Sequence, residues 1–166
     1  SKDLVVTDKA LFLSDYAFPV RENPNTFFVK LKNSLLNKKI VSISQFELDR
    51  VVVIEFSELF LILELFQDSN IILTDKAFDV LQLLYQKEWK DRELKKGKKY
   101  VFPKTNKENP AKVSGETLFE QFEKSSAAIL EEILSKVNIS PVIISEILLE
   151  LKISGKTKAK EISQKD

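Results

Sequence analysis

Short apolar runs, separated by joins of two or three polar residues, fill the first half of the chain. Val41 and Ile43 alternate with Ser42 and Ser44, and this two-residue period is typical of a half-buried strand. Because a helical crossover needs about a dozen residues, joins this short predict that neighbouring strands are antiparallel. The other runs rich in Val, Ile, Leu and Phe predict strands at residues 4–6, 10–13, 51–56, 59–66, 70–73 and 78–84.

One helix interrupts these strands, over roughly residues 24–37. Its start is predicted from Asn23-Pro24, a capping residue followed by proline at the first helical position. Its buried side is predicted from apolar residues at helical spacing, namely Phe27, Phe28, Leu31 and Leu35. An antiparallel sheet with one helix makes this half of the chain an α+β or a mainly-β unit and excludes a doubly wound fold.

Helical periodicity takes over in the last third of the chain. Ser114 caps a predicted helix whose apolar residues recur at helical spacing as far as Val137. Ser140-Pro141 begins a second helix, and residues 156–163 are predicted to form a third, short and basic one. A polar linker at residues 103–110 precedes them. We therefore expect two domains, an α+β domain over residues 1–112 and a small helical domain over residues 113–166.

The composition excludes several kinds of chemistry. The 166 residues contain no Cys and no His, which excludes disulfides, thiolate metal sites and the usual general base. No stretch groups acidic residues at the spacing of an all-carboxylate metal site, so neither a metal nor another cofactor is expected. The absence of Met indicates a fragment or a processed piece. We expect a domain that is not itself an enzyme.

Neither a membrane span nor a secretion signal is predicted. No apolar run reaches the length of about 18 residues that a membrane helix needs. The start of the chain lacks the pattern of a signal peptide. The expected location is therefore cytoplasmic, with no membrane partner.

Charge is segregated along the chain although the formal total is only +1. Residues 87–104 contain eight basic and three acidic residues, a local net charge of +5. A solvated charged loop is one interpretation. The other is an arm that binds nucleic acid, with Trp89 and Tyr100 stacking on bases or riboses. In that second interpretation the phosphates are contacted by a run of lysines, Lys95, Lys96, Lys98 and Lys99.

Four stretches, taken in order, resemble the signature segments of the NFACT family. The first joins a helix start at residues 22–24 to residues 39–52, and the second covers residues 63–75. The third is the basic, Gly- and Tyr-containing run at residues 94–103. The fourth, at residues 139–153, is similar to the helix-hairpin-helix element of the family. The resemblance therefore covers nearly the whole chain. The Lys-, Ile- and Leu-rich composition of the chain is more typical of archaeal than of bacterial members of the family.

The resemblance implies an antiparallel-sheet N-terminal domain, distantly like that of formamidopyrimidine-DNA glycosylases, followed by a helix-hairpin-helix domain. It also implies a function in ribosome-associated quality control. Members bind stalled large ribosomal subunits that carry peptidyl-tRNA, and they recruit aminoacyl-tRNA for template-free addition of C-terminal tails. The ribosome supplies the peptidyl-transferase chemistry, so the expected partners are the large subunit and tRNA.

The resemblance also implies which residues contact RNA. Asp49 and Arg50 match the positions that the family links to tRNA binding. Without the family resemblance, the pair would be interpreted as a solvated acid in a turn beside a surface arginine. Arg offers a planar fork for phosphate, and Asp can orient it or accept from a base edge. Lys156 and Lys158, beside Gly155, are placed to contact an RNA backbone as helix-hairpin-helix elements do.

Two other functions stay open at this point. An enzyme of the DNA-glycosylase type would need an N-terminal proline or a comparable amine nucleophile together with a carboxylate, and Ser1 heads this chain. A surface adhesin is suggested by the fibronectin-binding name that some members of the family carry.

Overall fold

The computed structural model describes residues 2–8, 10–19, 22–66, 68–104, 107–124 and 129–162, without the side chains of Phe122 and Lys160. The chain divides into two compact units, Ser1–Pro103 and Lys104–Asp166, called here the sheet unit and the helical unit. The predicted boundary lay later, between residues 112 and 113. The linker joins the helical unit because the backbone of Glu108 bonds to Lys136 and Asn138, at 2.9 and 2.7 Å.

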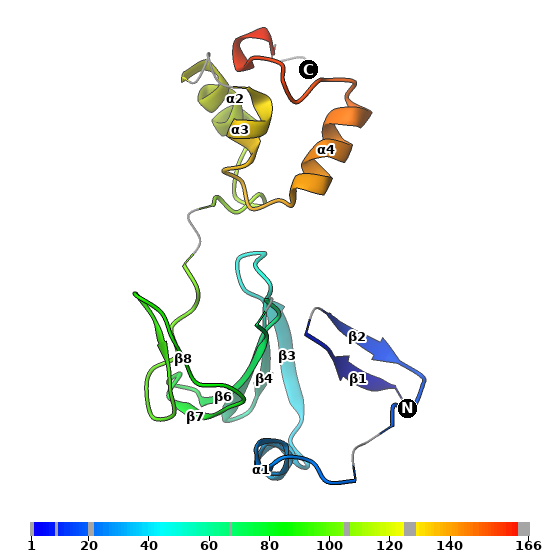
Figure 1. Ribbon diagram of the computed structural model, residues 1–166, viewed down its shortest axis with the longest axis vertical. Helices are drawn as coiled ribbons and strands as arrows, with labels where there is room; N and C mark the ends of the chain where they lie inside the picture. The colour runs from blue at the N-terminus through cyan, green and yellow to red at the C-terminus, as the bar shows by residue number, and fades with distance from the viewer. Residues whose placement is uncertain are drawn as a thin grey trace. The chain divides into compact units, whose positions relative to one another are not determined.

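A five-stranded antiparallel sheet forms the centre of the sheet unit (Figure 1). The strands follow one another in space as they do in the sequence, so each pairs with the next along the chain. The prediction of antiparallel neighbours is therefore confirmed. The strands are β3 (Ile40–Gln45), β4 (Val51–Phe56), β5 (Leu59–Glu64), β6 (Asn70–Asp75) and β7 (Val80–Leu83).

The central strands β4, β5 and β6 are buried on both faces, which explains why they read as continuous apolar runs. The edge strand β3 is exposed along its whole length, so the half-buried strand predicted from Val41 and Ile43 is wrong. Ile62 of β5 points to one face, into a cluster with Val51 and Ile72. Its neighbours Leu61 and Leu63 point to the other face, into a second cluster. Each face therefore has its own hydrophobic core within the sheet unit.

A hairpin and a helix cover the face that carries Leu61 and Leu63. The hairpin consists of β1 (Asp3–Val6) and β2 (Leu11–Ser14), and the helix is α1 (Thr26–Leu35). The cap of α1 is Asn25, whose side chain accepts from the Phe28 amide at 3.1 Å, and not the predicted Asn23. Phe28, expected in the core, is 42% exposed, because the packed side of the helix is formed by Leu31 and Leu35.

The basic segment, residues 87–104, covers the opposite face of the sheet. It contains the small β8–β9 hairpin (Lys87–Glu88 and Glu93–Leu94), and it buries Leu94 and Tyr100 against the sheet. Phe102 stacks on Phe46 with ring centroids 4.1 Å apart. A segment that carries most of the local positive charge is therefore also part of the hydrophobic core.

The helical unit contains α2 (Gly115–Lys124), α3 (Leu130–Leu134), α4 (Pro141–Glu150) and a 3-10 turn, η1 (Ala159–Glu161). The predicted caps Ser114 and Ser140 are confirmed, since each hydroxyl accepts from a backbone amide three residues on. The single helix predicted to run as far as Val137 is wrong. Ile129 is extended and bridges to Lys158, so a separate helix begins after it.

The third helix predicted for residues 156–163 is only partly found: η1 lies within it, and residue 163 lies outside the described residues. The assignment of this unit as a helix-hairpin-helix domain stays a prediction. Across the described ranges, no helix combines the length and the apolar character that a membrane crossing requires.

Candidate nucleic-acid interface

The turn between β3 and β4 presents the Asp49–Arg50 pair. The Asp49 amide donates to the Phe46 carbonyl at 2.7 Å and closes the turn. Between them, Glu47 and Leu48 both have left-handed backbone angles, with φ of 48° and 58°. Hairpin turns with such angles usually carry Asn, Asp or Gly, because a bulkier side chain is strained there. Strained backbone of this kind clusters at binding sites.

Asp49 is half-buried and its polar groups are engaged by its own turn. Its Oδ1 accepts from the Arg50 amide at 2.7 Å, and its carbonyl accepts from Gln45 Nε2 at 2.9 Å. These bonds hold the strained turn in one conformation. Asp49 therefore helps to hold the backbone that carries Arg50.

Arg50 is exposed, with a fixed backbone and a supported side chain. Its carbonyl accepts from the Leu65 amide at 2.8 Å, which extends the β4–β5 pairing as far as the turn. Its guanidinium lies over the ring of Phe66, 5.4 Å from the centroid. Among the described residues, no carboxylate forms an ion pair with it. Its donors are therefore available to a phosphate or a base edge.

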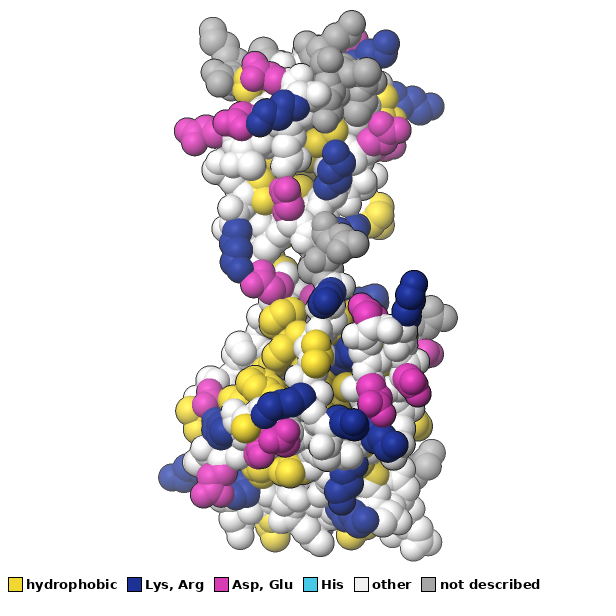
Figure 2. Space-filling view, turned by 90° about the vertical axis from the view of Figure 1, so that its left-hand side faces the viewer, with side chains coloured by type: hydrophobic (Ala, Val, Ile, Leu, Met, Phe, Trp, Pro, Cys, Tyr) yellow, Lys and Arg dark blue, Asp and Glu magenta, His cyan; other side chains and the backbone are white. Residues whose placement is uncertain are grey.

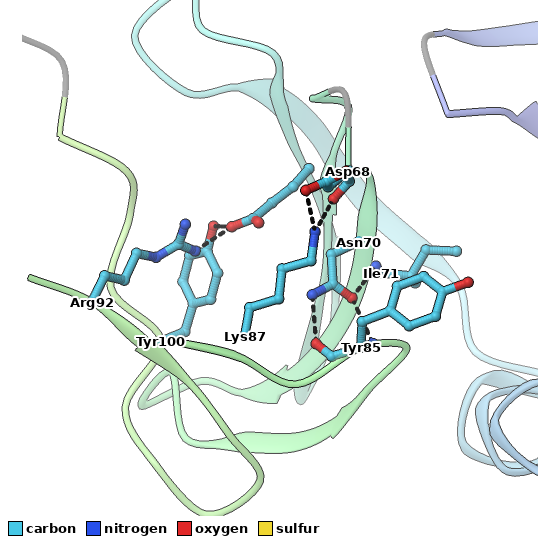
Figure 3. Close-up of polar contacts among 8 residues, drawn as sticks. Asp68, Asn70, Ile71, Tyr85, Lys87, Arg92 and Tyr100 are labelled. Carbon is cyan, nitrogen blue, oxygen red and sulfur yellow. Dashed lines mark hydrogen bonds and ion pairs between the residues drawn. The ribbon is translucent and has the colours of Figure 1, made fainter. Parts of the chain in front are cut away.

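A buried ion pair lies directly beside this turn (Figure 3). Glu64, which pairs with Val51 across the sheet, is 2% exposed. Its Oε1 accepts from Arg92 Nη2 and from the Tyr100 hydroxyl, the latter at 2.8 Å. Burial and the neighbouring Glu64 charge raise the pKa of Tyr100 far above its usual range, so the hydroxyl stays protonated and keeps donating.

The tip of the β8–β9 hairpin is anchored by this ion pair. The Arg92 guanidinium lies between two aromatic rings, 5.1 Å from the centroid of Trp89 and 5.1 Å from that of Tyr100. Lys87 reaches across to Asp68, whose backbone carbonyl accepts from its ammonium group. The β3–β4 turn, the β5–β6 join and the β8–β9 hairpin thus meet at one end of the sheet.

The prediction that Tyr100 stacks on bases is wrong. The residue is 5% exposed, and its ring packs edge-on against Phe102 with centroids 5.0 Å apart. Tyr combines a large apolar body with one polar atom, and here Glu64 satisfies that atom inside the core. Trp89 is 43% exposed, but Arg92 lies over its ring. Base stacking by Trp89 stays a prediction.

Residues 95–98, called here the lysine turn, come directly after β9 and are held against β7. The Gly97 amide donates to the Val80 carbonyl at 2.8 Å, and the φ of +79° at Gly97 explains why glycine stands there. Lys95, Lys96, Lys98 and Lys99 are all exposed. Lys98 and Lys99 have acidic partners, at 4.0 and 3.3 Å, whereas no ion pair of Lys95 or Lys96 occurs in the described part of the chain.

Basic side chains also gather on the surface of the sheet unit. Figure 2 faces the side on which β8 lies, and it shows several of them together, next to hydrophobic side chains. Lys156 and Lys158 are likewise exposed, but they belong to the helical unit, and their contact with an RNA backbone stays a prediction. In the described ranges, no three Asp or Glu side chains come together as a metal site would require.

Sequence reasoning missed three residues of this end of the sheet: Glu64, Phe66 and Arg92. Arg92 was counted only as one charge among many, and Phe66 as one more apolar residue of a strand. The signal for Glu64 was present, because a single acid inside the apolar run 59–66 must either break the strand or find a buried partner.

Comparison with known proteins agrees with this fold. The family described as "NFACT N-terminal and middle domains" matches residues 6–166. The N-terminal structure of the fibronectin/fibrinogen-binding protein from Streptococcus suis superposes with a TM-score of 0.70 at 26% identity. That match covers 82% of this chain and 57% of the solved one.

Two curated relatives are named for ribosome quality control or a homologue of it. The archaeal Rqc2 homolog aRqcH of Methanocaldococcus jannaschii is 30% identical over 129 residues, covering 74% of this chain. Ribosome quality control complex subunit 2 of Saccharomyces cerevisiae is 33% identical over 87 residues, covering 50% of this chain. The matched stretches span only 19% and 8% of those two relatives.

Removing the buried arginine is expected to cost far more than removing an exposed lysine. Arg92→Met leaves Glu64 charged and unpaired inside the core, so the free energy of unfolding should fall by about 3–5 kcal/mol. Lys98→Met, which breaks an exposed pair with Glu93, should change it by less than about 1 kcal/mol. Urea denaturation measures both. The double variant Glu64→Leu/Arg92→Met should be more stable than Arg92→Met; equal losses from Arg92→Met and Lys98→Met would contradict the assignment.

The raised pKa of Tyr100 predicts a loss of stability in alkali. Above a pH of about 10, Tyr100 loses its proton in the unfolded chain but keeps it in the folded one, so unfolding becomes easier as the pH rises. Tyr100→Phe should remove this part of the decline, whereas Tyr85→Phe, at an exposed position, should keep it. Unfolding free energies measured at roughly pH 9 and pH 11 decide the matter. Identical declines in both variants would contradict it.

Proposed function

The chain belongs to the NFACT family, and from that premise we propose that it contacts RNA in ribosome-associated quality control. In this proposal the intact protein binds stalled large ribosomal subunits carrying peptidyl-tRNA and recruits aminoacyl-tRNA for template-free tailing. It acts in the cytoplasm. The names of the two curated relatives support the process. We infer RNA contact by this chain from its own residues.

The observation that carries the proposal is that the Arg50 side chain is exposed and has no ion-pair partner among the described residues. Because it has no such partner there, the guanidinium, which lies over Phe66, is ready to bind an anion. The Arg50 amide donates to Asp49 Oδ1, which holds the backbone below it. A phosphate accepts two parallel hydrogen bonds from such a fork, a geometry that lysine cannot supply. The exposed lysines of the basic segment add sequence-independent attraction to the same ligand.

The chain's own residues serve for binding in this proposal. Asp49 is occupied by the Arg50 amide, and Glu64 is occupied by Arg92 and Tyr100. In this proposal neither carboxylate acts as a general base. The peptidyl-transfer step is assigned to the ribosome, and this chain positions tRNA.

The experiment compares Arg50 variants of the intact protein on purified large ribosomal subunits. Arg50→Ala should lower tRNA occupancy about tenfold or more, since a hydrogen bond to a charged group contributes about 1.5–3 kcal/mol. Arg50→Lys keeps the charge but loses the planar fork, so it should restore only part of the binding. Co-sedimentation followed by quantification of bound tRNA gives the occupancy.

Lys76→Ala is the matched control. Its ammonium also lies over an aromatic ring, that of Phe60 at 4.2 Å, but Glu55 pairs with it, so tRNA occupancy should be unchanged. Unchanged occupancy in Arg50→Ala, with normal folding, would refute the site. Fibronectin binding is a second candidate because the Streptococcus suis protein is named for it. Capture of plasma fibronectin by the same variants, with no tRNA bound, would favour that candidate.

A further inference from the structure

A second cationic site lies away from the Asp49–Arg50 turn, in a groove between α1 and the edge strand β7. The groove holds a volume of about 250 Å³. Lys30 of α1 lines it from one side, and Lys96 of the lysine turn lines it from the other. The residues from β7 are Leu81, Gln82 and Leu83. We call this the α1–β7 groove.

The charges of the groove are uncompensated. Both lysines are exposed, and within the described ranges neither takes part in an ion pair. The residues that line the groove include no Asp and no Glu. The neighbouring lysines differ, because Lys98 and Lys99 have acidic partners. Two ammonium groups on one small groove repel each other, and an anion bound between them would remove that cost.

The backbone of Lys30 is held by contacts between the helix and the sheet. The Ser34 hydroxyl donates to the Lys30 carbonyl at 3.0 Å, and its oxygen accepts from Gln82 Nε2 at 3.2 Å. This chain of bonds ties the last turns of α1 to β7. The lysine turn is tied to the same strand, since the Val80 amide donates to the Lys98 carbonyl at 2.9 Å. The backbone segments that carry the two lysines are therefore both held against one strand, β7.

The rest of the lining suits a sugar–phosphate unit. Phe27, Leu81 and Leu83 give the groove apolar walls, and the exposed amide of Gln86 adds a hydrogen-bonding group. A nucleic-acid backbone alternates an anionic phosphate with a less polar sugar, which matches a groove with cations at its sides and an apolar lining. An acidic peptide would present carboxylates but no such sugar surface.

We propose that the α1–β7 groove binds a backbone phosphate of RNA between Lys30 and Lys96. The inference rests on the proposed function, because it adds a second contact for the same RNA. Lys96 was already expected to contact phosphate, but Lys30 and the groove were not part of that expectation. In Figure 1, α1 lies beside the sheet. Because the groove lies between α1 and the edge strand β7, RNA bound there would contact the edge of the sheet as well as the β3–β4 turn.

The test measures the affinity of the intact protein for a labelled tRNA over a series of KCl concentrations. Lys30→Gln and Lys96→Gln should each weaken binding several-fold at low salt. Each should also reduce the slope of log K against log [KCl] by about one, since one phosphate contact is lost. Lys32→Gln makes the same charge change on the same helix but does not line the groove, so its slope should stay at the wild-type value.

The outcomes separate this inference from the proposed function. If Arg50→Ala weakens tRNA binding while Lys30→Gln and Lys96→Gln leave affinity and slope unchanged, the groove is refuted and the proposed function stands. If the intact protein does not bind tRNA, both fail. Competition by polyglutamate at the same charge concentration as tRNA would also overturn the inference, since it would show a general anion site. Thermal melts of each variant verify that α1 remains folded.

Discussion

The buried ion pair between Glu64 and Arg92 is the constraint on which the sheet unit's surface depends. Removing one partner of a buried charged pair is strongly destabilising, because it leaves an uncompensated charge in the core. Here the Tyr100 hydroxyl donates to the same Glu64 oxygen as Arg92 Nη2. Arg92 lies between two aromatic rings, and its buried Nε has no hydrogen-bond partner in the described part of the chain. One cluster thereby joins the end of β5 to the β8–β9 hairpin and to Tyr100, two residues after the lysine turn.

Both candidate RNA contacts can be traced back to this anchored segment. Glu64 precedes Leu65 and Phe66, which hold the backbone and the guanidinium of Arg50. On the other side, Tyr100 follows the lysine turn, and its amide donates to the Phe78 carbonyl at 2.7 Å. Core packing and surface charge are therefore not separate properties of residues 87–104. The same stretch that buries Leu94 and Tyr100 presents the lysines at fixed positions.

The central strands were predictable from the sequence because strands that are buried on both faces are apolar at consecutive positions. The β4 and β5 strands lie where Val51 to Phe56 and Leu59 to Phe66 indicated. The cap of α1 was predicted two residues too early, since Asn23 and Asn25 can both cap a helix and the structure uses Asn25.

The site was only partly predictable, because exposure depends on contacts between distant residues. Trp89 and Tyr100 are both aromatic residues among lysines, so the sequence does not distinguish their exposure. Tyr100 is buried, and its hydroxyl donates to Glu64, 36 residues away along the chain. Arg50 was found through its resemblance to a family position, whereas its support by Phe66 needed the structure. Ile129 has the right spacing for a helix, yet it pairs with Lys158, far along the chain.

Mapping the RNA contacts residue by residue tests the central claim, that the sheet unit holds RNA at a fixed surface. Ultraviolet crosslinking of tRNA to the intact protein, followed by mass spectrometry of the crosslinked peptides, gives this map. We predict crosslinks in peptides that contain residues 46–50 and 87–104. Crosslinks confined to the helical unit, around Lys156 and Lys158, would contradict the account.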